Sequence, residues 1–459
     1  MALVRSSAHL LIKTAAWLTI AGIITASACG SESSSNLVPS IPITTTNGSA
    51  PTPVTEMHDP SSAPNKTFLS PVFQPNGNRL AQGSGLATGF IQEVTTKDIE
   101  LNGIPTWITG ASTPTGDLWV IALNDGSLLS YQVPIGEQPL TATVPVDRLK
   151  AHQPPVLQVA DNLVRLVTTP VNASANSIAV HLAGERTAYI DNLHRLTVLE
   201  PDGNLWRPDI EVLPDSRLVQ LNKEQILVLA NPTNRHPYSA LGDDLEATTV
   251  VKVTVGSNEV TTIYNSGETV IESIAPLLAD MDGDGTAEVA LTLSDATHIW
   301  SVLVSTTGSG EIARSEPVDR LLGWRHILAL GPLGPNGQIQ LAEVLYPDGQ
   351  GNLVFLQKQG NSLEVAASLK GYRSHEFGSR NLEQALAADL DRDGHIEVIV
   401  PTLDRQNIAA VRNTPEGATE LWRRSIGGAL ATNIAVIERP DGTLSLAVAT
   451  NQGTLRIWQ

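Results

Sequence analysis

Cysteine is almost missing from this 459-residue sequence, because Cys29 is the only one. A single thiol cannot form a disulfide within the chain, and no pair of cysteines has the spacing of a zinc site. The sequence also contains no Gly-x-Ser-x-Gly, His-Glu-x-x-His or Walker motif. These absences remove the most specific sequence signatures of serine hydrolases, zinc proteases and nucleotide-binding enzymes.

Positive charge is scarce as well. The chain has 29 basic and 47 acidic residues, which gives a formal net charge of −18 at pH 7. Such a surface repels the phosphates of nucleic acids and anionic lipid headgroups. We therefore expect no nucleic-acid partner.

The first residues have the pattern of an export signal. A lightly basic start precedes an apolar run at residues 14–26, which is too short to span a bilayer comfortably. Cys29 follows in the context Ala26-Ser27-Ala28-Cys29-Gly30. This context resembles the lipobox of bacterial lipoproteins, although that family prefers leucine where this chain has Ala26. An ordinary secretory signal with a chance cysteine is the alternative.

The lipobox resemblance implies a signal peptide at residues 1–28 and a lipidated Cys29 as the mature N-terminus. In that family, aspartate directly after the cysteine favours retention in the inner membrane. Because this chain has Gly30 there, the resemblance also implies an anchor in the outer membrane of the cell envelope. Residues 29–68 are rich in Ser, Thr, Pro, Asn and Gly. They cannot bury enough apolar surface to offset the entropy of ordering, so we expect a disordered tether before a folded domain at residues 69–459.

The composition of the folded part favours an all-β fold. Charged residues make up only 17% of the chain, and glycine and proline are plentiful, at 36 and 29 residues. Short runs of Val, Leu, Ile and Thr recur between turn signals, as expected for strands.

Two acidic segments of nine residues share one pattern, and their first residues, Asp280 and Asp389, are 109 positions apart. Each has aspartate at positions 1, 3 and 5, glycine at position 6 and glutamate at position 9. Hard cations such as Ca²⁺ prefer such oxygen ligands, so the pattern predicts two calcium sites. A solvated acidic turn that happens to recur is the alternative. The carboxylates concerned are Asp280, Asp282, Asp284 and Glu288 in the first segment, and Asp389, Asp391, Asp393 and Glu397 in the second.

These segments do not fit an EF-hand, which needs glutamate at position 12 and a helix on each side. The twelfth residues are Leu291 and Val400. Apolar and partly β-branched runs follow the two glutamates, and such runs are typical of buried strands. We therefore expect each acidic loop to join two strands.

A longer repeat surrounds the loops. A strand, a turn that ends in glycine and a second strand occur at residues 117–131 and again at residues 444–458. The longer order strand, turn, strand, glycine, strand, without carboxylates, lies between the two acidic loops. The loops are thus two units apart, and each unit of roughly 50 to 58 residues has the length of a four-stranded propeller blade. The units lie near residues 105–131, 155–200, 215–255, 273–305, 325–357, 383–412 and 432–458.

The predicted fold class is therefore an all-β β-propeller, with seven blades of four antiparallel strands and with six or eight blades as alternatives. The last unit ends at Gln459 directly after its third strand. Since closure of the ring removes exposed strand edges, we expect the segment at residues 89–101 to supply the outer strand of the final blade.

The acidic loops resemble FG-GAP or VCBS-type repeats, the calcium-binding blades of integrin α-like propellers. The second copy fits best, since Phe377-Gly378 precede it and Val398-Ile399-Val400-Pro401 follow it; the first copy lacks the Phe-Gly pair. The resemblance implies that the backbone carbonyls of Thr286 and His395, at position 7, join the carboxylates as calcium ligands. Because all ligands come from one short loop, we expect structural rather than catalytic calcium.

Three polar clusters precede predicted inner strands, and their loops would gather at one end of the ring. Aromatic side chains that stack on a ligand and arginines that pair with carboxylates would suit an acidic sugar or a peptide, whereas ordinary turn chemistry is the alternative. The candidate ligand-binding residues are Arg235, His236 and Tyr238; Trp324, Arg325 and His326; and Tyr372, Arg373, His375, Glu376 and Arg380.

The function expected from these features is a lipid-anchored, calcium-stabilised propeller that binds or scaffolds a protein or glycan partner at the bacterial cell envelope. We predict no catalytic residue. A polysaccharide lyase or hydrolase built on a calcium-bearing propeller is the alternative, because the fold alone does not exclude it.

Overall fold

The computed structural model describes residues 66–72, 74–142, 148–160, 163–347 and 349–459. The expected signal peptide, Cys29 and nearly all of the expected tether lie outside these residues. The described residues belong to one compact unit, Ser61–Gln459. No helix in this part of the chain is long and apolar enough to cross a membrane.

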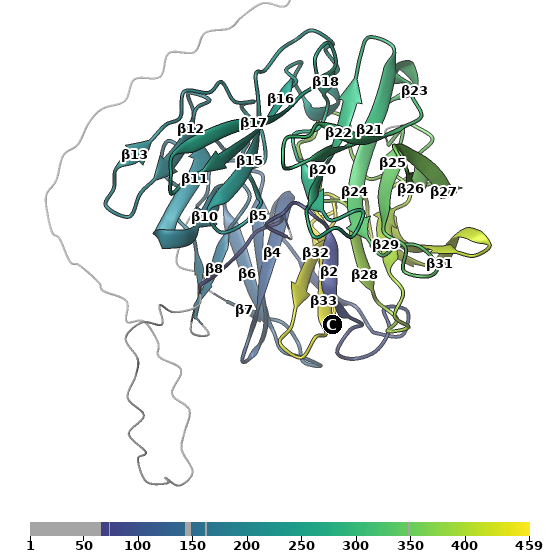
Figure 1. Cartoon of the computed structure of the whole chain (residues 1–459). Helices are drawn as coiled ribbons and strands as arrows, with labels where there is room; N and C mark the ends of the chain where they lie inside the picture. Colours follow the sequence, from purple (N-terminus) through teal and green to yellow (C-terminus); the bar gives the residue numbers. More distant parts are fainter. Residues whose placement is uncertain (1–65, 73, 143–147, 161–162, 348) are drawn as a thin grey trace, which may run out of the picture. The chain divides into compact units, whose positions relative to one another are not determined.

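Four-stranded antiparallel units follow one another along the described chain (Figure 1). The first three are β4 (Pro105–Thr113), β5 (Gly116–Leu123), β6 (Leu128–Val133) and β7 (Leu140–Thr141); β10 (Val180–Leu182), β11 (Arg186–Ile190), β12 (Leu196–Leu199) and β13 (Leu205–Trp206); and β14 (Val219–Gln220), β15 (Gln225–Ala230), β16 (Thr249–Thr254) and β17 (Glu259–Asn265).

The fourth and fifth units form one larger sheet, because their outer strands β22 and β27 pair in parallel over two residue positions. Their strands are β18 (Val270–Ile271), β19 (Leu277–Ala279), β20 (Glu288–Ser294), β21 (His298–Ser305), β22 (Glu311–Ser315) and β23 (Val318–Asp319); and β24 (Arg325–Gly331), β25 (Gln340–Leu345), β26 (Asn352–Gln359) and β27 (Ser362–Lys370). In the fourth unit, β18 and β19 both pair with β20, and β23 pairs with β21.

The last two units complete the series. They are β28 (Leu386–Asp389), β29 (Glu397–Pro401), β30 (Asn407–Thr414) and β31 (Gly417–Ser425), with β2 (Leu80–Ser84) added at the edge; and β32 (Ala435–Glu438), β33 (Leu444–Ala449) and β34 (Thr454–Trp458), with β3 (Lys97–Glu100). The described residues thus form seven units of four to six strands, where the sequence predicts four strands in each, and a three-stranded sheet is an eighth.

An additional three-stranded sheet lies between the first two units in chain order. It consists of β1 (Thr67–Leu69), β8 (Leu157–Ala160) and β9 (Leu163–Leu166). The predicted unit at residues 155–200 therefore covers two sheets, β8–β9 and β10–β13. The β8–β9 hairpin is short, and the partner of β8 comes from the N-terminal side of the chain. β1 begins at Thr67, close to residue 69, where we expect the domain to start.

The hydrophobic core lies between the faces of successive sheets. One cluster joins Ile108 and Trp119 of the first unit to Ile437 and Ile457 of the last, and comparable clusters join each later pair of neighbouring units from the second onward. On its other side the first unit packs against the three-stranded sheet, where Val120 meets Leu157 and Leu166. A strand that packs on both faces must be apolar along its whole length, which explains the continuous apolar runs after the acidic loops. β20 is accordingly buried at every position.

The N-terminal strand β3 closes the ring, as predicted. It pairs antiparallel with β34, from Lys97 opposite Ile457 to Glu100 opposite Thr454, and forms the outer strand of the final unit. Across this pair, Arg456 Nε donates to Asp98 Oδ1 at 2.7 Å. The chain end is also fixed, because the side chain of Gln459 donates to Asp117 Oδ2 and to the carbonyl oxygen of Val133.

The segment before β3 forms an N-terminal arm, residues 74–86, along the first strands of five successive units. The amides of Gln220, Leu278 and Ala387 donate to arm carbonyl oxygens. Further along, the amide of Leu444 donates to the carbonyl oxygen of Gly85. An exposed strand edge carries unpaired backbone groups, so the arm satisfies the free edges of these strands.

Arg79 fixes the middle of the arm through its guanidinium group, which is fully buried. Its three nitrogens donate to four backbone carbonyl oxygens, of Ala385 (2.9 Å), Pro71 (2.7 Å), Glu383 (3.2 Å) and Ile434 (2.7 Å). Burial lowers the pKa of Arg79 to about 10, and nearby Glu383 partly opposes this shift. One side chain thereby ties the arm to the last two units.

Replacing Arg79 should destabilise the ring. Arg79→Met would leave these buried carbonyls without donors, and we expect the free energy of unfolding to fall by about 3 kcal/mol or more. Arg148→Met is the matched control, since Arg148 is 62% exposed and pairs only with Asp125 on the surface. Urea unfolding followed by tryptophan fluorescence measures both variants. Equal loss of stability in the two variants would contradict the role of Arg79.

Candidate functional site

The two acidic loops occupy equivalent places in two units. The first joins β19 to β20 and the second joins β28 to β29, so both connect neighbouring antiparallel strands as expected. The strand register is also the same, because Ala279 lies opposite Glu288 and Ala388 lies opposite Glu397. Equal register places equivalent carboxylates in equivalent positions.

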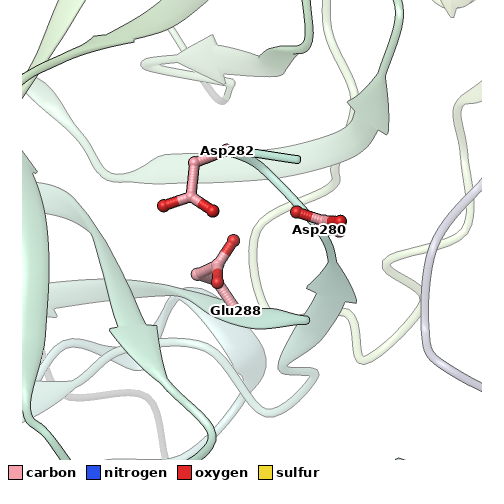
Figure 2. Close-up of side chains that lie close together, drawn as sticks. All are labelled: Asp280, Asp282 and Glu288. Atoms are coloured by element: carbon pink, nitrogen blue, oxygen red, sulfur yellow. The ribbon is translucent and has the colours of Figure 1, made fainter. Parts of the chain in front are cut away.

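Each loop brings three carboxylates together, from positions 1, 3 and 9. In the first loop these are Asp280, Asp282 and Glu288, which Figure 2 shows around one small space. The second loop gathers Asp389, Asp391 and Glu397. Within each triad the possible ligand oxygens lie within 4.8 Å of one another. These two acidic triads could therefore hold metal ions.

The two loops share several hydrogen bonds from backbone amides to carboxylates. The amide of Met281 donates to Glu288 Oε2, and that of Leu390 donates to Glu397 Oε2. The glycine at position 6 donates to the aspartate at position 1 in both loops. That glycine has a positive φ of 87° in the first loop and 85° in the second, a conformation that favours glycine. This turn explains why glycine occurs at position 6 in both segments.

The predicted ligands at position 5 are hydrogen-bonded to the backbone amides of the residues at position 7. Asp284 accepts a hydrogen bond from the amide of Thr286, and Asp393 accepts one from the amide of His395. The position-5 carboxylates therefore cap the turn and are not members of the triads. Asp393 also forms an ion pair with Arg412.

The glutamates are the least solvated members of the triads. Burial raises the pKa of Glu288, and the neighbouring aspartates raise it further. Burial also raises the pKa of Glu397 to about 8, with Asp391 and Asp393 adding to the effect. Burial and the clustered carboxylates together therefore disfavour negative charge on both glutamates.

Each triad already has one basic side chain at its margin. Lys358 Nζ lies 3.5 Å from Asp282 Oδ2, and Arg412 Nη1 lies 3.4 Å from Glu397 Oε1. The second triad retains an unsatisfied atom all the same, because Asp389 Oδ1 is buried without a hydrogen-bond partner among the described residues. Hard carboxylate oxygens and an orphaned ligand atom fit a hard divalent cation.

The three polar clusters predicted from the sequence lie in the loop between β15 and β16, at the start of β24, and in the loop between β27 and β28, and contacts connect them. Arg320 donates to the carbonyl oxygen of His236 and lies 5.0 Å over the ring of Tyr238. The amide of Gly378 donates to the carbonyl oxygen of Ala240, which links the loop between β15 and β16 to the loop between β27 and β28. Arg380 pairs with Asp215 and Asp243 across the same junction.

Several candidate ligand-binding residues lie beneath this junction and not on its surface. Trp324 and His326 stack at 5.4 Å, and His375 meets both rings edge-on. Arg325 is buried with Glu343, which accepts from its guanidinium group. The buried candidates are Trp324, Arg325, His326, Tyr372 and His375.

The remaining candidates, Arg235, His236, Tyr238, Arg373, Glu376 and Arg380, are exposed or half-buried. Large apolar side chains accompany them at this end, namely Leu321, Leu322 and Phe377, which are 90%, 61% and 54% exposed. Phe377 contacts Tyr238 edge-to-face at 6.3 Å. We refer to these three apolar residues as the loop-end surface.

The N-terminal arm borders a cavity of about 940 Å³ that no sequence motif indicates. Its lining comes from segments distant in the sequence, including Phe68, His181 and Arg217, and only His326 belongs to the predicted candidates. No local motif could mark such a site, because the fold brings its wall together from several separate segments.

No protein-family model matches the chain, and no curated protein matches its sequence. Among solved structures, the chain is similar to Sqt1 of Saccharomyces cerevisiae, with 10% identity and a TM-score of 0.48 over 79% of this chain and 97% of that one. It is also similar to the Dos1 propeller, with 8% identity and a TM-score of 0.48 over 79% and 93%. A third similar structure is the computationally designed protein Ika8, with 13% identity and a TM-score of 0.41 over 78% and 98%. The propeller assignment rests on the order and pairing of the chain's own sheets.

The buried histidine His326 should make stability depend on pH. Burial lowers its pKa well below the usual value, and the neighbouring His375 adds to this effect. Below a pH of about 6.5 the unfolded chain binds a proton that the folded protein excludes, so stability falls as pH falls. His326→Gln should lose less stability than the wild type between pH 7 and pH 5.

Thermal unfolding at both pH values measures this difference. His298→Gln is the control, because the side chain of His298 is 50% exposed, and it should keep the wild-type pH dependence. If His326→Gln and the wild type lose equal stability, the buried ring is not responsible.

Proposed function

We propose that this protein is a calcium-stabilised β-propeller that binds or scaffolds a partner at the bacterial cell envelope, where lipid on Cys29 anchors it in the outer membrane. The lipobox-like context of Cys29 supports the anchor. The resemblance of the acidic loops to FG-GAP or VCBS-type repeats supports calcium. The partner is a protein or a glycan, since the acidic chain disfavours nucleic acid.

The proposed calcium ions are structural. Each triad draws its carboxylates from one short connection between two buried strands. A bound cation there would neutralise carboxylates that otherwise repel one another and raise the pKa of Glu288 and Glu397. Extracellular sites bind calcium with dissociation constants of about 10⁻⁴ to 10⁻³ M, so weak sites suffice in this compartment.

The observation that carries the binding function is the convergence of three loops at the loop-end surface. Exposed apolar side chains that gather beside charged residues mark interaction sites on many proteins. Leu321 and Phe377 extend into solvent there, while Trp324 and His375 form a rigid support beneath them. A rigid support allows a surface to bind without a large loss of conformational entropy.

Calcium should raise the melting temperature of the wild type relative to EDTA. At 5 mM calcium the expected gain is about 1 to 2 kcal/mol per site, from the weak affinities above. The double variant Asp282→Asn/Asp391→Asn should lose this gain, because one carboxylate is removed from each triad.

Asp441→Asn is the matched control for this experiment. Asp441 lies in the equivalent connection of the last unit, between β32 and β33, and caps its turn by accepting from the amide of Thr443. It belongs to neither triad, so its variant should respond to calcium as the wild type does. An equal melting temperature in calcium and EDTA for the wild type would refute the metal part of the proposal.

Removing apolar side chains from the loop-end surface should weaken partner binding. We expect Leu321→Ser/Phe377→Ser to bind at least about tenfold more weakly than the wild type on an array of acidic glycans and peptides, a loss of about 1.4 kcal/mol for two contact residues together. Val365→Ser is the control, because Val365 is 63% exposed on the outer strand β27. If both variants bind as strongly as the wild type, the loop-end surface is not the binding site.

The same glycan samples distinguish a binding module from the enzymatic alternative, because they can be analysed for cleavage products. A lyase or hydrolase would release shorter products from a polyuronate or another acidic polysaccharide. A binding module retains the glycan without cleavage, and the loop-end surface should then account for the retention.

A further inference from the structure

The cavity beside the N-terminal arm lies where the three-stranded sheet, the β10–β13 unit and the first strands of the next three units meet. Its volume of about 940 Å³ is within the range of small-molecule sites, which is about 300 to 1,000 Å³. Much of the wall is apolar, with Val219, Leu277 and Leu328 among the lining residues. Phe68 stacks on the ring of His181 at 3.9 Å and forms an aromatic part of the wall.

The charge of this wall is opposite to that of the protein. Its basic residues outnumber its acidic residues six to two, whereas the whole chain has 29 basic and 47 acidic residues. The acidic residues are Glu185 and Glu383. The basic residues are Lys66, Arg79, Arg165, Arg186, Arg217 and Lys223. A cavity with walls of low dielectric concentrates such a positive potential.

Among the described residues, three of these cations have a carboxylate within 4 Å. Lys66 pairs with Glu185, Arg186 pairs with Glu200 at 2.8 Å, and Arg217 lies 3.8 Å from Glu383. Arg165 and Lys223 have no carboxylate within 4 Å in the part of the chain that the structure describes. The positive charge of the wall is therefore not balanced by its own acidic residues.

Arg217 is the strongest candidate contact. Its side chain is 4% exposed, and its nearest carboxylate is Glu383, at 3.8 Å from Nη2. Nη2 donates to the carbonyl oxygen of Arg380 at 2.9 Å. Nε is buried without a hydrogen-bond partner among the described residues, and no acceptor for Nη1 occurs there either. A buried guanidinium with unused donors is costly unless an anion completes its hydrogen bonds.

His181 adds a second unused polar atom. Its Nδ1 lies 3.0 Å from Thr187 Oγ1, while its buried Nε2 has no partner among the described residues. Burial lowers the pKa of His181 to about 4, so the ring is neutral at pH 7. It therefore presents one hydrogen-bonding nitrogen and one flat apolar face.

We propose that this cavity binds an organic oxyanion, a carboxylate or a phosphate ester carried on an apolar body. Arg217 pairs with the oxyanion, Arg165 and Lys223 supply further positive potential, and the Phe68–His181 pair with the aliphatic wall holds the body. Arginine suits both kinds of oxyanion, because its planar fork of donors matches their oxygens. The proposal depends neither on calcium nor on the loop-end surface.

Fluorescence titration with 8-anilinonaphthalene-1-sulfonate, an aromatic anion, tests the proposal, and the uncharged N-phenyl-1-naphthylamine serves as the matched probe. We expect one equivalent of the anion to bind and the neutral probe to bind at least about tenfold more weakly. Decanoate or decyl phosphate should displace the anion, and the stronger competitor identifies the preferred oxyanion. Decanol should not displace it.

Single and double variants test whether the anionic probe binds in the cavity. Arg217→Met should weaken binding of the anionic probe at least about tenfold, while Arg148→Met on the surface should leave it unchanged. Arg165→Gln should weaken it several-fold, and this exposed change tests the cavity even if Arg217→Met fails to fold. Leu321→Ser/Phe377→Ser should bind the probe normally, because its changes lie at the loop-end surface.

Three results would overturn the inference. The first is equal affinity for the neutral and anionic probes. The second is unchanged affinity in Arg165→Gln and in folded Arg217→Met. The third is loss of binding in Leu321→Ser/Phe377→Ser, which would place the probe on the loop-end surface.

Discussion

The hydrogen bonding of the N-terminal arm to five successive units, which includes the first strands β14, β19, β24 and β28 and the second strand β33 of the last unit, is the interaction on which the rest of this structure depends. Without a partner, those strands would leave backbone groups unpaired at their free edges. The arm supplies carbonyl oxygens to the amides of Gln220, Leu278, Ala387 and Leu444, and Arg79 ties it to the last two units. The same arm borders the cavity and continues into β3, so closure of the ring and formation of the cavity have one cause.

The acidic loops and the arm are connected at the second triad. The amide of Gly85 donates to the carbonyl oxygen of Asp389, and Arg392, at position 4 of that loop, donates to the carbonyl oxygens of Ser84 and Leu86. The second acidic loop, when it is held in one conformation, therefore also fixes the position of the arm. Two features that are about 300 residues apart in sequence thus support each other in the fold.

The sequence predicts the parts of this structure that are encoded locally. The acidic loops could be found because their carboxylates and the glycine at position 6 lie within nine residues, and β3 could be found because the last unit lacks an outer strand. Arg79 and Arg217 could not be found, since their partners come from several separate units. The burial of Trp324 and His375 likewise depends on packing between loops that no local pattern describes.

Hydrogen exchange of backbone amides tests the role of the arm most directly. Gln220, Leu278 and Ala387 donate to arm carbonyl oxygens, so their amides should exchange as slowly as amides of the fully buried strand β33. If these three amides exchange at the rate of exposed turns while β33 stays protected, the arm does not hold the ring.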